Sequence, residues 1–81
     1  MTISILTPDK EIFSGAIKSV KVPGTDGQFQ VLRNHAAIVS SLVKGEVTVV
    51  KEGGEKLTFS IKGGFIEVLN NTISLLVKGV A

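Results

Sequence analysis

Apolar and polar side chains alternate along most of the chain, and this two-residue period constrains the fold more than any other feature. Successive side chains of a β-strand point to opposite faces, so such alternation predicts strands with one buried face. Eleven Val, eight Ile and six Thr make 25 of the 81 residues β-branched, which also favours strands. The residues expected on the buried faces are Ile3, Ile5, Val20, Val22, Phe29, Val31, Val47, Val49, Leu57, Phe59, Ile61, Ile73, Leu75 and Val77.

Glycine, proline and asparagine separate the alternating runs. Because Gly and Asn tolerate positive φ, residues 52–55 and Asn70-Asn71 are predicted to form primed hairpin turns. Residues 34–43 lack alternation and are predicted to be a loop, with room for one helical turn started by Asn34. The pattern predicts short antiparallel strands in two packed sheets or a small barrel. The turn segments are Pro23-Gly24-Thr25-Asp26-Gly27, Lys44-Gly45, Gly53-Gly54, Gly63-Gly64 and Asn70-Asn71.

Length and composition exclude several classes of protein. Eighty-one residues allow a single domain. The chain has no Cys, which excludes disulfides, Cys-based zinc sites and iron–sulfur clusters. Nine basic residues against seven acidic ones are scattered along the sequence, which disfavours nucleic acid as a partner. No run of about 20 apolar residues is present, so we expect no direct membrane insertion.

Residues that could carry catalysis are sparse. His35 is the only His, and it is better explained as a structural or interface residue than as part of a Ser-His-Asp triad with Asp9 or Asp26. One His without Cys does not make a typical zinc site. The glycines at 24 and 27 are not followed by the Gly-Lys-Ser/Thr of a phosphate loop. We therefore expect no catalytic residue, no metal and no cofactor.

A small β binding module is the alternative to consider. Lipoyl and biotinyl carrier domains have a similar size, and Asp9-Lys10 matches their Asp-Lys pair, although their modified Lys lies at a hairpin tip near mid-chain. A barrel that binds single-stranded nucleic acid needs exposed aromatics, whereas Phe29 and Phe59 are expected in the core.

Some apolar residues fall on the opposite phase from the main face of their strands. They are either buried on a second side or part of a docking surface. These residues are Leu32, Val50, Ile66 and Leu76.

Four segments together resemble the ε subunit of the F-type ATP synthase. The combination of the Pro-Gly-Thr-Asp-Gly turn with the later His-Ala pair is the most specific part, and the similarity covers essentially all 81 residues but only the N-terminal domain of that family. The segments are Phe13-Ser14-Gly15, Val22 to Leu32, His35-Ala36 and Gly63-Gly64-Phe65-Ile66-Glu67-Val68.

The resemblance implies a fold, a location and a role. The fold is a flattened β-sandwich of two five-stranded, mostly antiparallel sheets. The role is that of a central-stalk rotor subunit between the γ subunit and the c-ring, which couples proton translocation to ATP synthesis without catalysing a reaction. It implies a peripheral location on the cytoplasmic side of a bacterial inner membrane, as part of F1.

The resemblance also assigns residues to two partners. A loop of five residues would face the c-ring, with Asp26 as its charge and Gln28 where the family often has Glu. A second set would face γ. The c-ring loop is Gly24, Thr25, Asp26, Gly27 and Gln28, and the γ-facing set is Thr7, His35, Ala36, Ile38, Val39 and Ser40.

Longer members of the family continue with a helical hairpin that inhibits ATP hydrolysis and in some cases binds ATP. No such hairpin follows Ala81 in this sequence. We therefore expect residues 1–81 to form one sandwich domain, with neither inhibition by an extended helix nor ATP binding.

Overall fold

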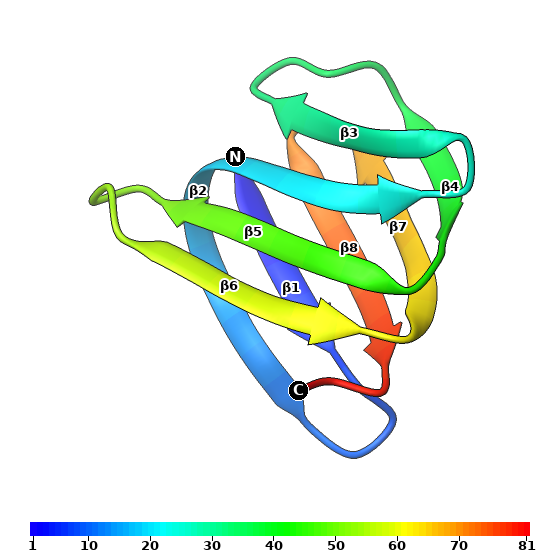
Figure 1. Ribbon diagram of the computed structural model, residues 1–81. Coiled ribbons are helices and arrows are strands. Elements are labelled where there is room, and N and C mark those ends of the chain that lie inside the picture. The colour runs from blue at the N-terminus through cyan, green and yellow to red at the C-terminus, as the bar shows by residue number, and fades with distance from the viewer.

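The computed structural model describes residues 1–81, which form eight β-strands joined by short turns (Figure 1). Every strand pair is antiparallel except β1 with β8, which is parallel. The all-β prediction is confirmed, and the chain contains no helix capable of spanning a bilayer. The strands are β1 (Thr2–Leu6), β2 (Glu11–Gly24), β3 (Gly27–Leu32), β4 (Ile38–Leu42), β5 (Gly45–Lys51), β6 (Lys56–Ile61), β7 (Gly63–Leu69) and β8 (Thr72–Lys78).

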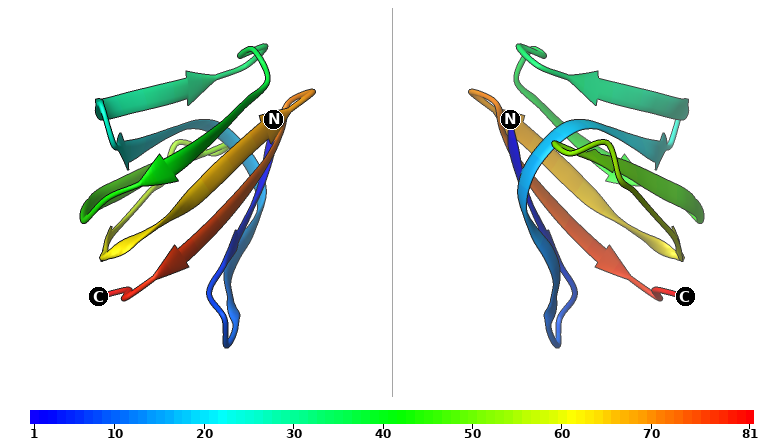
Figure 2. Two further views of the ribbon diagram at one scale, coloured as in Figure 1. Left: turned by 90° about the vertical axis from the view of Figure 1, so that its right-hand side faces the viewer. Right: turned by 90° about the vertical axis from the view of Figure 1, so that its left-hand side faces the viewer.

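The strands pack as two layers that face each other (Figure 2). Layer one consists of β4, β7, β8, β1 and the first half of β2. Layer two consists of β3, the second half of β2, β5 and β6. The predicted sandwich is confirmed, but the count of five strands in each sheet is not. Layer two has four strands, extended only by Ala81, which exchanges two backbone hydrogen bonds with Ser60 on β6.

The long strand β2 connects the two layers, because its 14 residues run through both. Its first half pairs with β1, and its second half pairs with β3 and β5. Between the halves the register with β5 shifts, from Ile17 to Ser19, and the adjacent residues Ser19 and Val20 are both buried. A bulge of this kind bends a strand. The bulge therefore turns β2 from one layer into the other. It also buries Ser19, although strict alternation with the buried Val20 would place Ser19 on the outer face.

The core between the layers contains 16 buried apolar side chains. Twelve of the fourteen predicted core residues are among them, and Phe29 and Leu57 are half-buried against the same core. Of the off-phase residues, Leu32 and Leu76 are exposed, whereas Ile66 is fully buried. The off-phase interpretation of Ile66 was wrong because β7 pairs with β8 so that Ile66 lies opposite the core residue Leu75.

Two hairpin turns differ in type although both were predicted to be primed. Asn70 and Asn71 connect β7 to β8 with φ of 49° and 61°, as a type I′ turn requires, which confirms that prediction. In the β5–β6 hairpin only Gly54 has a positive φ, 94°, and its N–H donates to the Lys51 carbonyl at 2.9 Å. That hairpin is therefore a type I turn followed by a left-handed Gly, and the primed turn predicted for residues 52–55 was wrong.

Residues 34–43 do not contain the predicted helical turn, because residues 38–42 form β4. This strand pairs with β7 along its whole length, from Ile38 opposite Val68 to Leu42 opposite Gly64. Ser40 occupies an inward-facing position, so the alternation is weak in the sequence. Pairing with β7 decides the conformation instead.

Gly63 and Gly64 begin β7 and do not form the predicted turn. Gly64 has a φ of 152°, and a Cβ atom at this position would overlap the carbonyl oxygen of Leu76 on β8. Only Gly permits this close approach of the two backbones.

We expect Gly64→Ala to lower the free energy of unfolding by about 2 kcal/mol or more, because a strained backbone residue costs of order 1–3 kcal/mol even before steric overlap. Gly53→Ala is the matched control, since a Cβ there meets nothing within 4 Å. Its effect should stay below about 0.5 kcal/mol. Chemical denaturation measures the free energy of unfolding of both variants. An equal decrease in the two would show that the close approach at Gly64 does not require Gly.

Candidate partner-binding surfaces

The hairpin tip between β2 and β3 contains the five residues that the resemblance assigns to the c-ring. Gly24 pairs with Gly27, and Thr25 and Asp26 form the turn between them. Gly27 has a φ of 125°, so the tip is a type I turn followed by a left-handed Gly. Gly24 is buried and the other four residues are exposed. The tip thus presents backbone and hydroxyl groups together with one carboxylate, that of Asp26.

Phe29 and a backbone hydrogen bond hold the base of this tip. A Cβ at Gly24 would lie 2.8 Å from the Phe29 ring and 2.9 Å from the Gly27 carbonyl oxygen, so Gly is needed for the ring to lie against the backbone. The N–H of Val43 donates to the carbonyl of Pro23 at 2.9 Å. The tip is therefore fixed both to its own hairpin and to the segment that follows β4.

The loop that precedes β4 is held by a reciprocal contact between two asparagines. The N–H of Asn34 donates to Oδ1 of Asn71 at 2.7 Å, and Nδ2 of Asn71 donates to Oδ1 of Asn34 at 3.1 Å. Asn34 has a φ of 66°, and the N–H of His35 donates to the Leu32 carbonyl at 3.1 Å. The β7–β8 turn therefore positions the His35 loop across a sequence separation of 37 residues.

His35 is half-buried beside this contact, and its ring Nδ1 donates to the carbonyl of Ala36 at 2.7 Å. The ring hydrogen bond thus goes to the backbone and not to a Ser hydroxyl or a carboxylate. Nowhere in the chain do three His, Asp or Glu side chains come together as a metal site. The chemistry available in the loop is hydrogen bonding and packing.

The strand β4 presents only part of the set assigned to γ. Ile38 and Ser40 face inward, and Ile38 packs against the core. Val39 faces outward and is 72% exposed. Strand alternation explains the difference, because consecutive residues cannot share a face.

The outer face of layer one carries further exposed apolar side chains. Leu76 was among the off-phase residues singled out in the sequence, but Phe65 and Leu69 were missed. Phe65 precedes the apolar Ile66, so the sequence cannot tell which of the two faces outward. On β4, β7, β8 and β1, away from the strand ends, the only charged outward residue is Glu67, and the other outward positions are apolar or carry hydroxyl groups.

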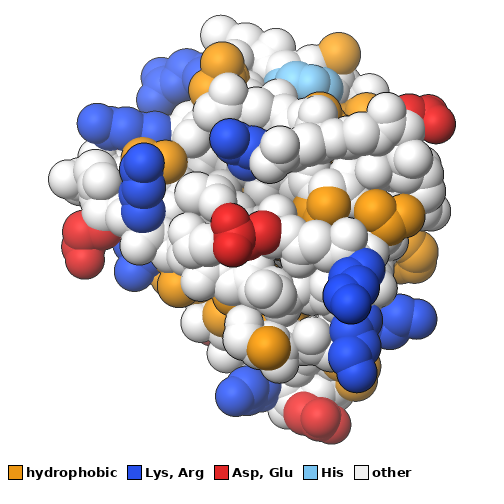
Figure 3. All heavy atoms as spheres, in the orientation of Figure 1, with side chains coloured by type: hydrophobic (Ala, Val, Ile, Leu, Met, Phe, Trp, Pro, Cys, Tyr) orange, Lys and Arg blue, Asp and Glu red, His pale blue; other side chains and the backbone are white.

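The outer face of layer two is different. Acidic and basic side chains are scattered over the side of the molecule that contains β3, β5 and β6 (Figure 3). Lys21, Glu46 and Lys56 are all exposed there. Interface cores are depleted of charged residues, so layer one is the better candidate for a protein interface.

Thr7 borders a hollow together with Gly63 and Lys78, whereas His35 borders one with Asn70 and Asn71, so the two residues lie at opposite ends of the β7–β8 hairpin. Its Oγ1 accepts hydrogen bonds from the N–H groups of Asp9 and Lys10 at 3.3 and 3.1 Å, which closes the β1–β2 turn. The structure therefore does not bring Thr7 together with the rest of the γ-facing set. A partner that contacts both ends must cover the whole outer face of layer one.

Thr7 also borders an open hollow of about 640 Å³ at this end of the sandwich. Its floor includes the buried residues Leu42 and Val77, and no carboxylate lines it. Three lysines surround it: Lys44, Lys62 and Lys78.

A family model described as "ATP synthase, Delta/Epsilon chain, beta-sandwich domain" matches residues 1–81. The chain belongs to this ATP synthase family. Because the match covers every strand of the sandwich, it supports the resemblance noted in the sequence and removes the carrier-domain alternative.

Relatives of this ATP synthase family differ in length. An ATP synthase epsilon chain of Chlorobaculum tepidum is 44% identical over 80 residues, which is 99% of this chain and 91% of the relative. One of Protochlamydia amoebophila is 40% identical over 78 residues, 96% of this chain but 53% of the relative. The chain thus spans about half the length of some curated relatives and nearly all of others.

Solved ATP synthase structures contain the same fold. A chain in the OSCP/F1/c-ring structure of the Euglena gracilis mitochondrial enzyme is 23% identical with a TM-score of 0.89, over 98% of this chain and 51% of that one. A chain in the central stalk/c-ring structure from Tetrahymena thermophila is 16% identical with a TM-score of 0.84, over 99% and 64%.

The two asparagines at the β7–β8 turn allow a test of how the His35 loop is held. We expect Asn71→Gly to lower the free energy of unfolding by about 1 kcal/mol and to speed amide hydrogen exchange in residues 33–37, because it removes both side-chain hydrogen bonds. Asn70→Gly is the control, since Asn70 also has a positive φ but makes no side-chain hydrogen bond. Unchanged exchange in the Asn71 variant would show that the contact does not position the loop.

Proposed function

We propose that this domain is a non-catalytic rotor subunit of ATP synthase that joins γ to the c-ring and couples proton translocation to ATP synthesis. The observation that carries the proposal is the arrangement of two unlike surfaces on one rigid sandwich. A nearly uncharged outer face is suited to a large protein contact, while the β2–β3 hairpin presents a narrow polar tip. Family membership supports the same role.

The proposed γ interface is the outer face of layer one. Val39 lies within it, His35 and Ala36 adjoin the Asn70-Asn71 turn at one end, and Thr7 borders the hollow at the other end. Ile38 and Ser40 would act indirectly, because they face inward and support β4 beneath Val39. With extents of 27 × 24 × 18 Å, the domain is small enough for one interface of about 800 Å² per partner to reach both ends.

The proposed c-ring contact is the β2–β3 tip, Gly24, Thr25, Asp26, Gly27 and Gln28. A rigid tip loses little conformational entropy on binding. The single carboxylate of Asp26 is suited to a basic loop on the partner, while Gln28 adds hydrogen bonding without charge. In this role the subunit transmits torque and forms no covalent bond.

The proposed location follows from these partners. The domain would lie on the cytoplasmic side of a bacterial inner membrane as part of F1. It would be held there by γ and the c-ring, without inserting into the bilayer itself.

Binding of purified γ by the chain tests the first interface. We expect Val39→Asp to weaken γ binding at least tenfold, because it replaces an apolar contact with a carboxylate directly opposite the like charge of Glu67, and tenfold corresponds to about 1.4 kcal/mol. Leu32→Asp is the control, since Leu32 is also exposed, at 53%, but lies on β3 in layer two. Isothermal titration calorimetry gives both affinities. Failure of the unmodified chain to bind γ would overturn the proposal. An equal loss of γ affinity in both variants would show that the interface is not the outer face of layer one.

Charge reversal at the tip tests the second contact. We expect Asp26→Lys to reduce coupled proton pumping in assembled complexes while leaving the unfolding temperature nearly unchanged, because Asp26 is exposed. Glu52→Lys is the matched control, since Glu52 is exposed in the other hairpin that combines a type I turn with a left-handed Gly. Full pumping by the Asp26 variant would exclude a coupling role for this carboxylate.

A further inference from the structure

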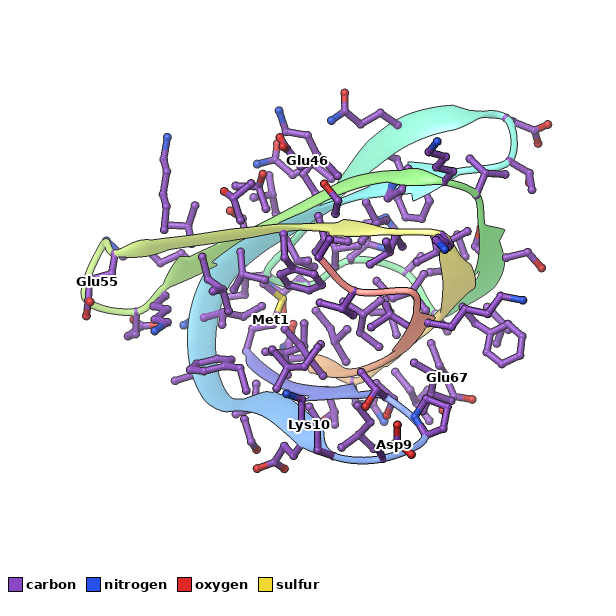
Figure 4. The ribbon with its side chains drawn as sticks, turned by 60° about the horizontal axis from the view of Figure 1, so that its bottom comes forward. Met1, Asp9, Lys10, Glu46, Glu55 and Glu67 are labelled. Carbon is purple, nitrogen blue, oxygen red and sulfur yellow. The ribbon has the colours of Figure 1, made fainter.

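Glu67 is the only charged outward residue of β4, β7, β8 and β1 away from the strand ends. It lies in the middle of β7, opposite Val39 on β4 and Ser74 on β8. Its side chain points away from the sandwich, and Glu46 points away on the opposite side (Figure 4). Twenty per cent of the chain is charged, so one carboxylate in an otherwise neutral face is a departure from the rest of the surface.

Two shallow apolar hollows flank this carboxylate. One, of about 200 Å³, is lined by Glu67 with Val39, Phe65 and Leu76. The other, of about 260 Å³, is lined by Glu67 with Val39 and Leu69. No Lys or Arg lines either hollow, and the side-chain hydrogen bonds of the structure do not involve Glu67. The chain itself therefore offers this carboxylate no partner in the hollows.

A protein that covers the face would remove water from Glu67. An ionised carboxylate that loses its water without gaining a partner is strongly penalised, whereas one that gains a cation with good hydrogen-bond geometry is compensated. Apolar side chains around the pair exclude water and strengthen the attraction. The face therefore discriminates against partner surfaces that lack a cation at this position.

We infer that Glu67 is the specificity-determining residue of the interface, and that it binds one Arg of the partner between two apolar side chains that occupy the flanking hollows. Arg fits better than Lys, because its guanidinium binds a carboxylate through two parallel hydrogen bonds and can stack on an aromatic ring. Phe65 supplies such a ring in the same hollow as Glu67. This inference rests on the proposed function, since it takes γ as the protein that covers the face.

The test compares γ binding by the complete 81-residue chain and by variants at position 67. Glu67→Gln retains the shape and removes the charge, and we expect it to weaken binding by about tenfold or more, since truncating a paired buried charge acts mainly on dissociation. The matched control is Glu46→Gln on the outer face of layer two, where Glu46 is also exposed. Its affinity should remain within about twofold of the unmodified chain.

A second variant separates pairing from simple packing. Glu67→Met fills a similar volume with an apolar side chain. If Glu67 only stayed solvated at the rim of the interface, this variant would bind γ as tightly as the unmodified chain or more tightly. The inference predicts weaker binding instead, because the partner's Arg would lose its counterion. Thermal unfolding of each variant without γ should match the unmodified chain, since Glu67 is exposed and makes no side-chain hydrogen bond.

The outcomes separate the two proposals. Weaker binding by both Glu67 variants, with the Glu46 variant unaffected, supports the inference. Binding of both Glu67 variants as tight as that of the unmodified chain overturns it and leaves the γ contact standing. If the unmodified chain does not bind γ, the proposed function fails, and the inference fails with it.

Discussion

The hydrogen bonding of β2 to both layers is the constraint on which the rest of the structure depends. One end of the strand pairs with β1 and the other with β3 and β5, so the layers cannot slide past each other without breaking these backbone bonds. The shared strand closes the apolar core of 16 side chains in a molecule with a radius of gyration of only 11.2 Å. It also ends at the polar tip, which therefore belongs to the same rigid body as the outer face of layer one.

The two outer faces show how a sandwich separates folding from recognition. Inward positions must be apolar to form the core, while outward positions are free to carry other chemistry. In layer two these positions carry charged side chains, which remain hydrated and therefore disfavour a desolvated protein interface. In layer one they carry hydroxyl groups and apolar side chains around Glu67. Such a face costs little to desolvate, except at the one carboxylate, which makes that residue decisive for the choice of partner.

Rigidity at the ends of the sandwich comes from positions where the backbone conformation restricts the choice of residue. Gly24 permits the Phe29 ring to lie against the β2–β3 tip, and Gly64 permits β7 to approach β8. Asn71 combines a left-handed turn conformation with side-chain hydrogen bonds to Asn34. In the proposed role as a link between γ and the c-ring, such local constraints would matter, because a contact point that yields under load would not transmit torque.

The sequence by itself determined most of the strands, most of the core and the Asn70-Asn71 turn, because alternation and positive-φ preferences act within a few residues. Its residues also indicated the family. Only the tertiary structure decided which of Phe65 and Ile66 faces outward, that residues 38–42 form a strand, and that Ser19 is buried, since each depends on pairing with a distant strand. The separation of Thr7 from His35 and the isolation of Glu67 have the same origin. Local preferences specify single strands, whereas the surface of a sheet is assembled from register between strands that are far apart in the chain.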